Sequence, residues 1–287
     1  MTEAFEDIFY RSDDGLSLYA RDYGSNSNSP VVLCMHGLTR NSSDFHSLAL
    51  TLKDDFRVIS VDQRGRGRSD YDSDSTNYRP DIYCGDMLSL LSSLDLNQVI
   101  AIGTSMGGIM AMMMAAQRPG IFTKIILNDI GPEIDPAGLA RIKGYIGVTR
   151  PFKNWAAATS AVKAQGPEIF PDYTDEDWKK FARRTCVELP DGRVDFAYDP
   201  MISEPIQSDD TVTEPVDMWP MFRALHNVPV LTIRGSLSDI LSGETVQKMS
   251  LLHPEFSSVE IPRVGHAPML DEPESLKAID EFLKGTV

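Results

Sequence analysis

The stretch Val99-Ile-Ala-Ile-Gly-Thr-Ser-Met-Gly-Gly108 decides the fold of this chain. Residues 99–102 are apolar and rich in β-branched side chains, a composition typical of a buried parallel strand. Residues 106–118 follow with almost no loop and have the apolar content of a helix. Ser105 therefore lies at a sharp bend between a strand and a helix.

Two glycines, Gly103 and Gly107, flank Ser105 two residues away on each side. A turn this tight leaves no room for side chains at those positions, which explains the Gly-x-Ser-x-Gly pattern. We expect the turn to hold Ser105 in a strained backbone conformation, with its hydroxyl exposed at the carboxyl edge of the sheet. A chance match to this pattern is expected in about one chain in ten of this length. Further motifs are therefore needed to assign a chemistry.

Composition limits the class of protein. With 287 residues, 42% of them hydrophobic, the chain is long enough for one large α/β domain with an inserted subdomain. The formal net charge of −15 argues against nucleic acid or an anionic membrane as a partner, so a basic or a neutral ligand fits better. No dinucleotide-binding or phosphate-binding glycine pattern occurs, and no residue pattern indicates a metal site. The oligomeric state is left open.

The cysteines and the N-terminal residues indicate where in the cell the protein is expected. Cys34, Cys84 and Cys186 are widely spaced and form no Cys-x-x-Cys pair, which suggests reduced thiols. Residues 1–7 are acidic and lack a long apolar run, so we expect neither a secretory signal nor a transmembrane helix. The sequence predicts a cytoplasmic protein.

Strand-like and helix-like segments alternate along most of the chain. The expected strands are residues 5–10, 16–22, 31–35, 56–61, 99–102, 124–128, 228–235 and 257–261, and the expected helices between them are residues 45–52, 82–94, 106–118, 243–252 and 273–283. The first two strands form an antiparallel pair around Asp13-Asp14-Gly15. The alternation predicts an α/β fold with a mostly parallel eight-stranded sheet and helices on both faces.

The alternation is interrupted over residues 131–219, which carry helix signals at 136–148, 155–164 and 175–185 but no buried strand of the earlier kind. We therefore divide the chain into a core, residues 1–130 and 220–287, and an inserted helical lid, residues 131–219, over the carboxyl ends of the strands. Trp155, Trp178 and Trp219 either line a substrate pocket or form the lid's own core, and the sequence does not distinguish the two.

A serine hydroxyl needs a base within hydrogen-bond reach, and the base needs an acid that fixes its tautomer. Only His266 lies on a glycine-flanked loop directly after the last expected strand, at the edge where Ser105 emerges. Two carboxylates follow strands at the same edge, Asp129 and Asp239. Asp239 is preferred because it combines the chain order Ser, Asp, His with a strand–loop context of the expected kind. Asp129 is the alternative.

The loop at residues 62–69 holds three arginines, Arg64, Arg66 and Arg68, directly before the acidic stretch Asp70-Tyr-Asp-Ser-Asp74. Such a cluster is typical of an anion site. Because the following carboxylates offset the charge, we instead predict a solvated, internally paired loop.

These motifs resemble those of the α/β-hydrolase superfamily, in particular lidded serine hydrolases of the esterase, enol-lactonase and C–C hydrolase branches. The resemblance covers nearly the whole chain except the lid, and its motifs are His36-Gly37, Asp62-x-Arg-Gly-x-Gly-x-Ser69, Gly-Thr-Ser105-Met-Gly, Ser-Asp239 and Gly-His266. Members with Asp at the bend are dehalogenases or epoxide hydrolases, and the serine argues against those activities.

The resemblance implies a role for each motif. It makes Ser105 the nucleophile, His266 the general base and then acid, and Asp239 the residue that orients His266. It further implies that the backbone N–H groups of Leu38 and Met106 form an oxyanion hole. His36 precedes the nucleophile on a different loop, so we interpret its ring as a structural tie for that loop.

The function expected from these motifs is hydrolysis of a carboxylic ester or lactone of a small substrate through an acyl-enzyme, with no cofactor. The expected partner is a small-molecule ester or lactone. Two alternatives remain: a C–C bond hydrolase or perhydrolase with the same triad, and a non-catalytic small-ligand receptor on the same fold. Arg40, two residues beyond Leu38, is a candidate for binding a substrate carboxylate, although a plain surface position is also compatible with the sequence.

Overall fold

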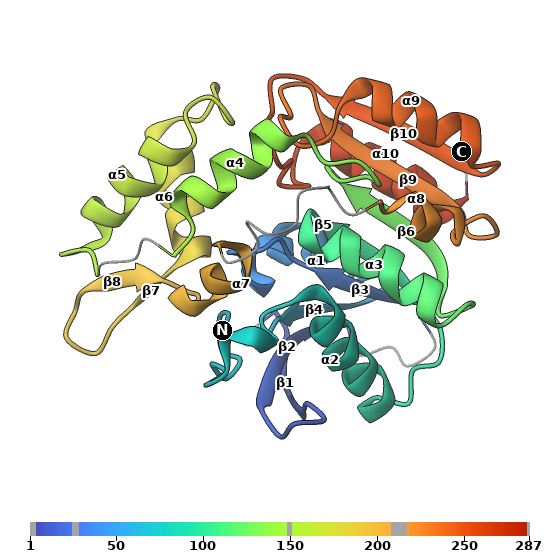
Figure 1. Cartoon of the computed structure of the whole chain (residues 1–287). Helices are drawn as coiled ribbons and strands as arrows, with labels where there is room; N and C mark the ends of the chain where they lie inside the picture. The colour runs from blue at the N-terminus through green and yellow to red at the C-terminus, as the bar shows by residue number, and fades with distance from the viewer. Residues whose placement is uncertain (1–3, 25–28, 148–150, 208–216, 286–287) are drawn as a thin grey trace.

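An eight-stranded sheet forms the centre of the molecule (Figure 1). The computed structural model describes residues 4–24, 29–147, 151–207 and 217–285. The strands of this sheet are β1 (Glu6–Arg11), β2 (Ser17–Tyr23), β3 (Val31–Met35), β4 (Arg57–Asp62), β5 (Val99–Thr104), β6 (Phe122–Asn128), β9 (Val230–Gly235) and β10 (Phe256–Ile261). They lie in the order β1-β2-β4-β3-β5-β6-β9-β10. Strand β2 is antiparallel to both of its neighbours and all other pairs are parallel, which confirms the predicted sheet.

Helices cover both faces of the sheet. They are α1 (His46–Leu52), α2 (Pro80–Ser93), α3 (Met106–Gln117), α8 (Trp219–Arg223), α9 (Gly243–Leu252) and α10 (Pro273–Lys284). Alternate residues of a strand point to opposite faces. Leu33 and Ala101 pack in the cluster that includes α2 and α3, whereas Val32 and Ile100 pack in the cluster that includes α1 and α10. Figure 1 shows α2 and α3 side by side on one of these faces.

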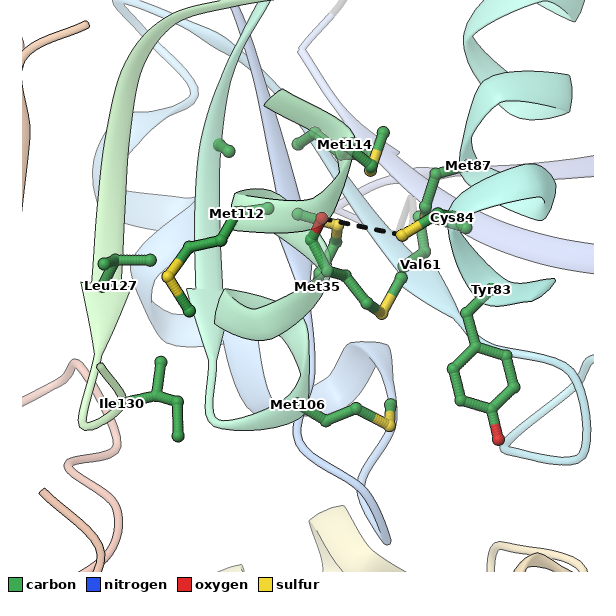
Figure 2. Packing of buried hydrophobic residues seen from close by; sticks show 14 of the residues in the cluster. Met35, Val61, Tyr83, Cys84, Met87, Met106, Met112, Met114, Leu127 and Ile130 are labelled. Atoms are coloured by element: carbon green, nitrogen blue, oxygen red, sulfur yellow. Dashed lines mark hydrogen bonds between the residues drawn. The ribbon is translucent and has the colours of Figure 1, made fainter. Parts of the chain in front are cut away.

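Methionines fill much of the core between β5, α2 and α3 (Figure 2). Met106, Met112 and Met114 of α3 are buried, and they pack in one cluster with Met35 and Met87. The thioether side chain is unbranched and flexible, so it fills irregular gaps between a helix and a sheet. The three cysteines are free and buried. Burial raises the pKa of the Cys84 thiol to about 12.

The segment between β6 and α8 contains three of the predicted helices, α4 (Pro136–Tyr145), α5 (Trp155–Gln165) and α6 (Asp175–Thr185), and the short α7 (Glu204–Gln207). The predicted end of α4 at Val148 lies outside the described residues. A two-stranded hairpin, β7 (Cys186–Glu188) and β8 (Val194–Phe196), was not predicted, because three-residue strands are too short to show a period. In Figure 1, α4, α5, α6 and the hairpin lie beside the sheet rather than on either of its faces.

The loop of three arginines is paired but not solvated. Arg64 is buried and forms ion pairs with Asp14, Asp72 and Asp86. Arg66 is also buried, and only Arg68 is exposed. The predicted pairing within the loop is confirmed only for Arg64 and Asp72, because Arg68 pairs with Asp7 of β1 and Arg66 donates to two carbonyls and the Tyr83 hydroxyl. The predicted solvation is wrong for two of the three arginines. Three carboxylates around one guanidinium offset the cost of its desolvation.

Within the four described ranges, no helix combines the length and the apolar character needed to cross a bilayer.

Candidate active site

Ser105 lies between the end of β5 and the start of α3, as the sequence predicts. Its backbone has φ 51° and ψ −114°, a conformation that residues other than glycine rarely adopt. A Cβ added at Gly103 would lie 2.4 Å from the Gly107 carbonyl carbon, and one added at Gly107 would lie 2.0 Å from the Met35 carbonyl oxygen. Glycine is therefore required at both positions, because another stretch of main chain lies where a side chain would begin. This confirms the prediction that the turn leaves no room for side chains at Gly103 and Gly107.

His266 follows β10 and contacts both Ser105 and a carboxylate. Its Nε2 lies 2.9 Å from Ser105 Oγ, and its Nδ1 lies 2.8 Å from Asp129 Oδ2. The His266 side chain is only 8% exposed and that of Asp129 is fully buried. With the proton on Nδ1, the ring donates to Asp129 and accepts from the Ser105 hydroxyl. The geometry is that of a serine, histidine and aspartate relay.

The Asp129 carboxylate is held by three donors. Besides His266, the Ser238 hydroxyl donates to Oδ2 at 2.6 Å, and the Gly235 N–H donates to Oδ1 at 2.8 Å. Asp129 has φ 54°, so the chain turns sharply where β6 ends, as it does at Ser105 after β5. A buried carboxylate needs such compensation, and here every donor also fixes its orientation.

The expectation that Asp239 pairs with His266 is wrong in this structure. Arg141 of α4 binds both Asp239 oxygens, with Nε donating at 2.5 Å and Nη2 at 2.8 Å. The physical reason is the path of the loop after β9, which turns Ser238 toward Asp129 and Asp239 toward α4. The carboxylate beside His266 is Asp129, the alternative that the sequence left open.

The His36-Gly37 loop lies against Ser105. A Cβ added at Gly37 would be 3.7 Å from Ser105 Cβ, which places the following residue, Leu38, beside the serine. In the described part of the chain, the N–H groups of Leu38 and Met106 have no hydrogen-bond acceptor. The Leu38 carbonyl accepts from Arg66 Nε at 3.0 Å, so a buried cation holds the adjacent peptide group, between Leu38 and Thr39.

His36 is a structural residue, as predicted. Its Nδ1–H donates to the Gly37 carbonyl at 2.7 Å, and its Nε2 accepts from the Gln63 N–H at 3.0 Å. Complete burial lowers the pKa of His36 to about 3. The ring is therefore neutral at physiological pH and ties its loop to the loop after β4.

One pocket contains both Ser105 and His266, and helices α4, α5 and α6 contribute to its walls. Of the three predicted tryptophans, only Trp178 lines it. The Trp155 indole donates to Glu188 and stacks with Arg183, and the Trp219 indole donates to Glu133, so neither lines the pocket. Of the two roles that the sequence left open, pocket lining is therefore wrong for Trp155 and Trp219. The sequence shows where the tryptophans stand in the chain, but it does not show whether their side chains point toward the pocket.

Arg40 does line the pocket, but its guanidinium is occupied. Its Nε and Nη2 donate to the Asp44 carboxylate at 2.7 and 2.5 Å, and its Nη1 donates to Thr185 Oγ1 at 2.5 Å. The group also stacks over the Phe181 ring, 4.1 Å from its centroid. Arg40 therefore lies in the pocket wall and not on the open surface, and each of its nitrogens already has a partner within the chain.

Similarity to known proteins agrees with this geometry. The model of the alpha/beta hydrolase family matches residues 31–279, most of the chain. The 3-hydroxybutyrate-oligomer hydrolase of Cupriavidus necator is 34% identical over 270 residues, which cover 92% of each chain. The chain belongs to the α/β-hydrolase family. The 2-(acetamidomethylene)succinate hydrolase of Mesorhizobium japonicum is 29% identical over 96% of this α/β hydrolase and 95% of the relative.

A solved structure extends the comparison to the whole fold. The crystal structure of an α/β hydrolase from Novosphingobium aromaticivorans superposes with a TM-score of 0.94 at 43% identity, covering 99% of both chains. The likeness therefore includes the helices between β6 and α8 as well as the sheet.

Three site residues of this α/β hydrolase are not indicated by any sequence motif. Ser238 holds Asp129, Arg141 faces the pocket, and Asn128 Nδ2 donates to the Pro268 carbonyl at 2.8 Å beside His266. Each acts through a contact between segments that lie about a hundred or more residues apart in the chain. No local pattern marks such residues, although Asn128 and Ser238 each stand next to an aspartate that was considered.

Proposed function

We propose that this protein hydrolyses carboxylic esters of small substrates, including lactones, through an acyl-enzyme on Ser105. The observation that carries the proposal is the unbroken hydrogen-bond relay from Ser105 through His266 to Asp129. Such a relay lets a neutral imidazole remove the serine proton, because the buried carboxylate stabilises the imidazolium that forms.

The reaction proceeds in two transfers of the acyl group. Ser105 Oγ attacks the ester carbonyl carbon while His266 Nε2 takes the hydroxyl proton, and a tetrahedral oxyanion forms. The oxyanion then collapses, and the leaving alcohol takes the proton from His266. Water attacks the acyl-enzyme with His266 again as base, which releases the carboxylic acid and restores the Ser105 hydroxyl.

We assign the oxyanion to the backbone N–H groups of Leu38 and Met106. The position of Gly37 against Ser105 and the free N–H groups support this assignment. Two fixed donors stabilise charge that develops only during the reaction, and the loss of one such donor costs roughly 3–4 kcal/mol of transition-state stabilisation. Arg66 acts as a positioning residue here, because it binds the Leu38 carbonyl.

We further propose that residues 131–219 act as a lid over the site. Pocket-lining residues on α4, α5 and α6, such as Ile142, Val162 and Trp178, support this division. A lid that excludes water strengthens the electrostatic interactions of the site. Because these residues are mostly apolar, the pocket favours a substrate with an aliphatic part.

The first test is hydrolysis of p-nitrophenyl esters from acetate to octanoate. The wild type should show burst kinetics and a preference for one chain length, and Ser105→Ala should abolish both. Ser93→Ala, at an exposed position near the end of α2, is the matched control and should match the wild type. If the wild type hydrolyses no ester and a fluorophosphonate does not label Ser105, the proposal is wrong and a ligand receptor becomes the better reading.

A second candidate function uses the same triad in another reaction: hydrolysis of an acyl compound that is not an ester, hydrolysis of a C–C bond, or peracid chemistry. The similarity to the 2-(acetamidomethylene)succinate hydrolase over 96% of the chain favours hydrolysis of an acyl compound that is not an ester. Labelling of Ser105 by a fluorophosphonate without turnover of any ester would select this candidate. Release of acetate from 2-(acetamidomethylene)succinate would then identify the bond.

A further inference from the structure

Two arginines line a pocket whose other walls are largely apolar. Arg40 comes from the loop after β3, and Arg141 comes from α4. A cation beside an apolar pocket costs desolvation, so its presence calls for a partner. Each arginine has an aspartate partner, Asp44 for Arg40 and Asp239 for Arg141. The two pairs differ in how many N–H groups of the arginine remain for a ligand.

Arg40 has little left to offer a ligand. Asp44 and Thr185 accept from one N–H of each guanidinium nitrogen, three of the five N–H groups, and the stacked Phe181 ring covers one face. Its side chain is 13% exposed. Arg40 therefore serves as a structural cation, and the carboxylate-binding role considered for it from sequence does not fit its contacts.

Arg141 keeps one edge available. Asp239 binds Nε and Nη2, so the bidentate pair leaves Nη1 with its two N–H groups. The side chain is 29% exposed, and the residue lines the pocket that holds Ser105. Because Asp239 fixes the guanidinium in place, a ligand that binds Nη1 does not have to immobilise a free side chain.

Helix α4 holds Arg141 at this position. A Cβ added at Gly138 would lie 2.2 Å from the Asp239 carbonyl oxygen, so α4 contacts the loop after β9 directly. Arg141, Ile142 and Tyr145 follow Gly138 at three, four and seven residues, which places all four on one face of the helix. That face points toward both the Asp239 loop and the pocket.

Tyr145 adds a second polar group at the same place. Its hydroxyl lies close enough to the Arg141 guanidinium to interact with it directly, and Arg40 also acts on it electrostatically. Burial raises the pKa of Tyr145 above the usual range, the largest of these effects. The hydroxyl therefore stays protonated and able to donate a hydrogen bond. A guanidinium edge and a phenol together match the two oxygens of a carboxylate.

We propose that Arg141 Nη1 and the Tyr145 hydroxyl form a subsite for a carboxylate, so that the preferred substrates are esters that carry a free carboxylate near the ester bond. This inference rests on the proposed ester hydrolysis and specifies its substrate class. Esters of hydroxy acids and half-esters of dicarboxylic acids both have this chemistry. The negative net charge of the chain, −15, makes a local cation the more necessary for an anionic substrate.

The test compares matched substrates in which a free carboxylate is replaced by a neutral group. For a carboxylate on the acyl side, the pair is mono-p-nitrophenyl glutarate and p-nitrophenyl valerate. For a carboxylate on the alcohol side, the pair is 3-acetoxybutyrate and its methyl ester. The wild type should have the higher kcat/KM for the charged member of at least one pair, and that pair identifies the side of the ester bond that lies at Arg141.

In Arg141→Gln, the ratio of kcat/KM between the charged and neutral esters should fall about tenfold to a hundredfold, the range expected for a lost hydrogen bond to a charged group. Arg141→Lys should retain part of the ratio, because it keeps the charge and loses the planar edge. Arg193→Gln, at an exposed arginine between β7 and β8, is the control and should leave the ratio unchanged. A wild type that prefers the neutral esters, or an equal loss for both esters in Arg141→Gln, overturns the proposal.

Failure of ester hydrolysis itself is distinguishable from failure of the subsite. If the wild type hydrolyses neither pair, calorimetric titration of glutarate into the wild type and Arg141→Gln decides the question. Binding that weakens about tenfold or more in the variant supports the subsite without the esterase activity. Equal binding by the two proteins, or no binding by either, overturns it.

Discussion

Two loops at the same edge of the sheet each offer a carboxylate, and they use it differently. Asp129 follows β6 and is fully buried, with three hydrogen-bond donors that include His266. Asp239 follows the neighbouring strand β9, is 36% exposed and binds Arg141. The residue type and the sheet edge are the same in both. The direction in which the backbone turns decides which carboxylate reaches the histidine.

Ser238 connects the two loops. Its hydroxyl donates to Asp129, and it accepts from the N–H groups of Ile240 and Leu241, so it also shapes the loop that carries Asp239. Ser238 thus supports the proposed triad, and the next residue, Asp239, supports the pocket wall. Asp239, which the sequence favoured as the acid of the triad, instead binds Arg141 of α4.

The largest effect should come from exchanging the carboxylates for amides one at a time. Asp129→Asn removes the acceptor that fixes the His266 tautomer, so kcat for a neutral p-nitrophenyl ester should fall by about 10⁴. Asp239→Asn should lower it by less than about tenfold, because Asp239 does not contact His266. Steady-state kinetics of the two variants side by side make the measurement. A larger loss in Asp239→Asn than in Asp129→Asn would reverse the assignment of the acid.

The sequence was sufficient for the fold because the deciding signals are local. The apolar run at residues 99–102 and the glycines around Ser105 fix a strand, a bend and a helix within ten residues. His266 was placed by its own loop in the same way. The choice between Asp129 and Asp239 depends on backbone turns after β6 and β9, which chain order alone does not specify. The direction of Trp155 likewise depends on how α5 packs, which involves distant segments.

A smaller effect is expected from Ser238→Ala, which removes a hydrogen bond to a buried charged group. We expect kcat to fall about tenfold to a hundredfold with a smaller change in KM, because Asp129 and therefore His266 lose a fixed position. Ser238→Thr keeps the hydroxyl and should restore much of the activity. A pure rise in KM would show instead that Ser238 acts only through the pocket wall.

Gly138→Ala probes the contact between α4 and the β9 loop. The new methyl group would collide with the Asp239 carbonyl, so unfolding in urea should show a loss of about 1–3 kcal/mol. Gly144→Ala is the matched control on the same helix, because a Cβ there meets no atom within 4 Å. The control should be neutral or stabilising by up to about 1 kcal/mol, since alanine favours the helix. Equal results for the two variants would show that α4 is not held by this loop.

The smallest effect concerns the stability that the Arg141–Asp239 pair supplies. Its hydrogen bonds to Arg141 lower the pKa of Asp239 in the folded protein, so the folded state holds the charged carboxylate more firmly than the unfolded state does. This contribution is present above the usual aspartate pKa of about 3.9 and is lost as the pH falls through the lower, folded value. Because both side chains are about a third exposed, we expect it to be below about 1 kcal/mol. The difference in unfolding free energy between the wild type and Asp239→Asn should therefore be small at pH 7 and shrink toward pH 3. A difference that grows as the pH falls would mean that Asp239 stabilises the protein through its protonated form, and the contrast with Asp129 would then have a different physical basis.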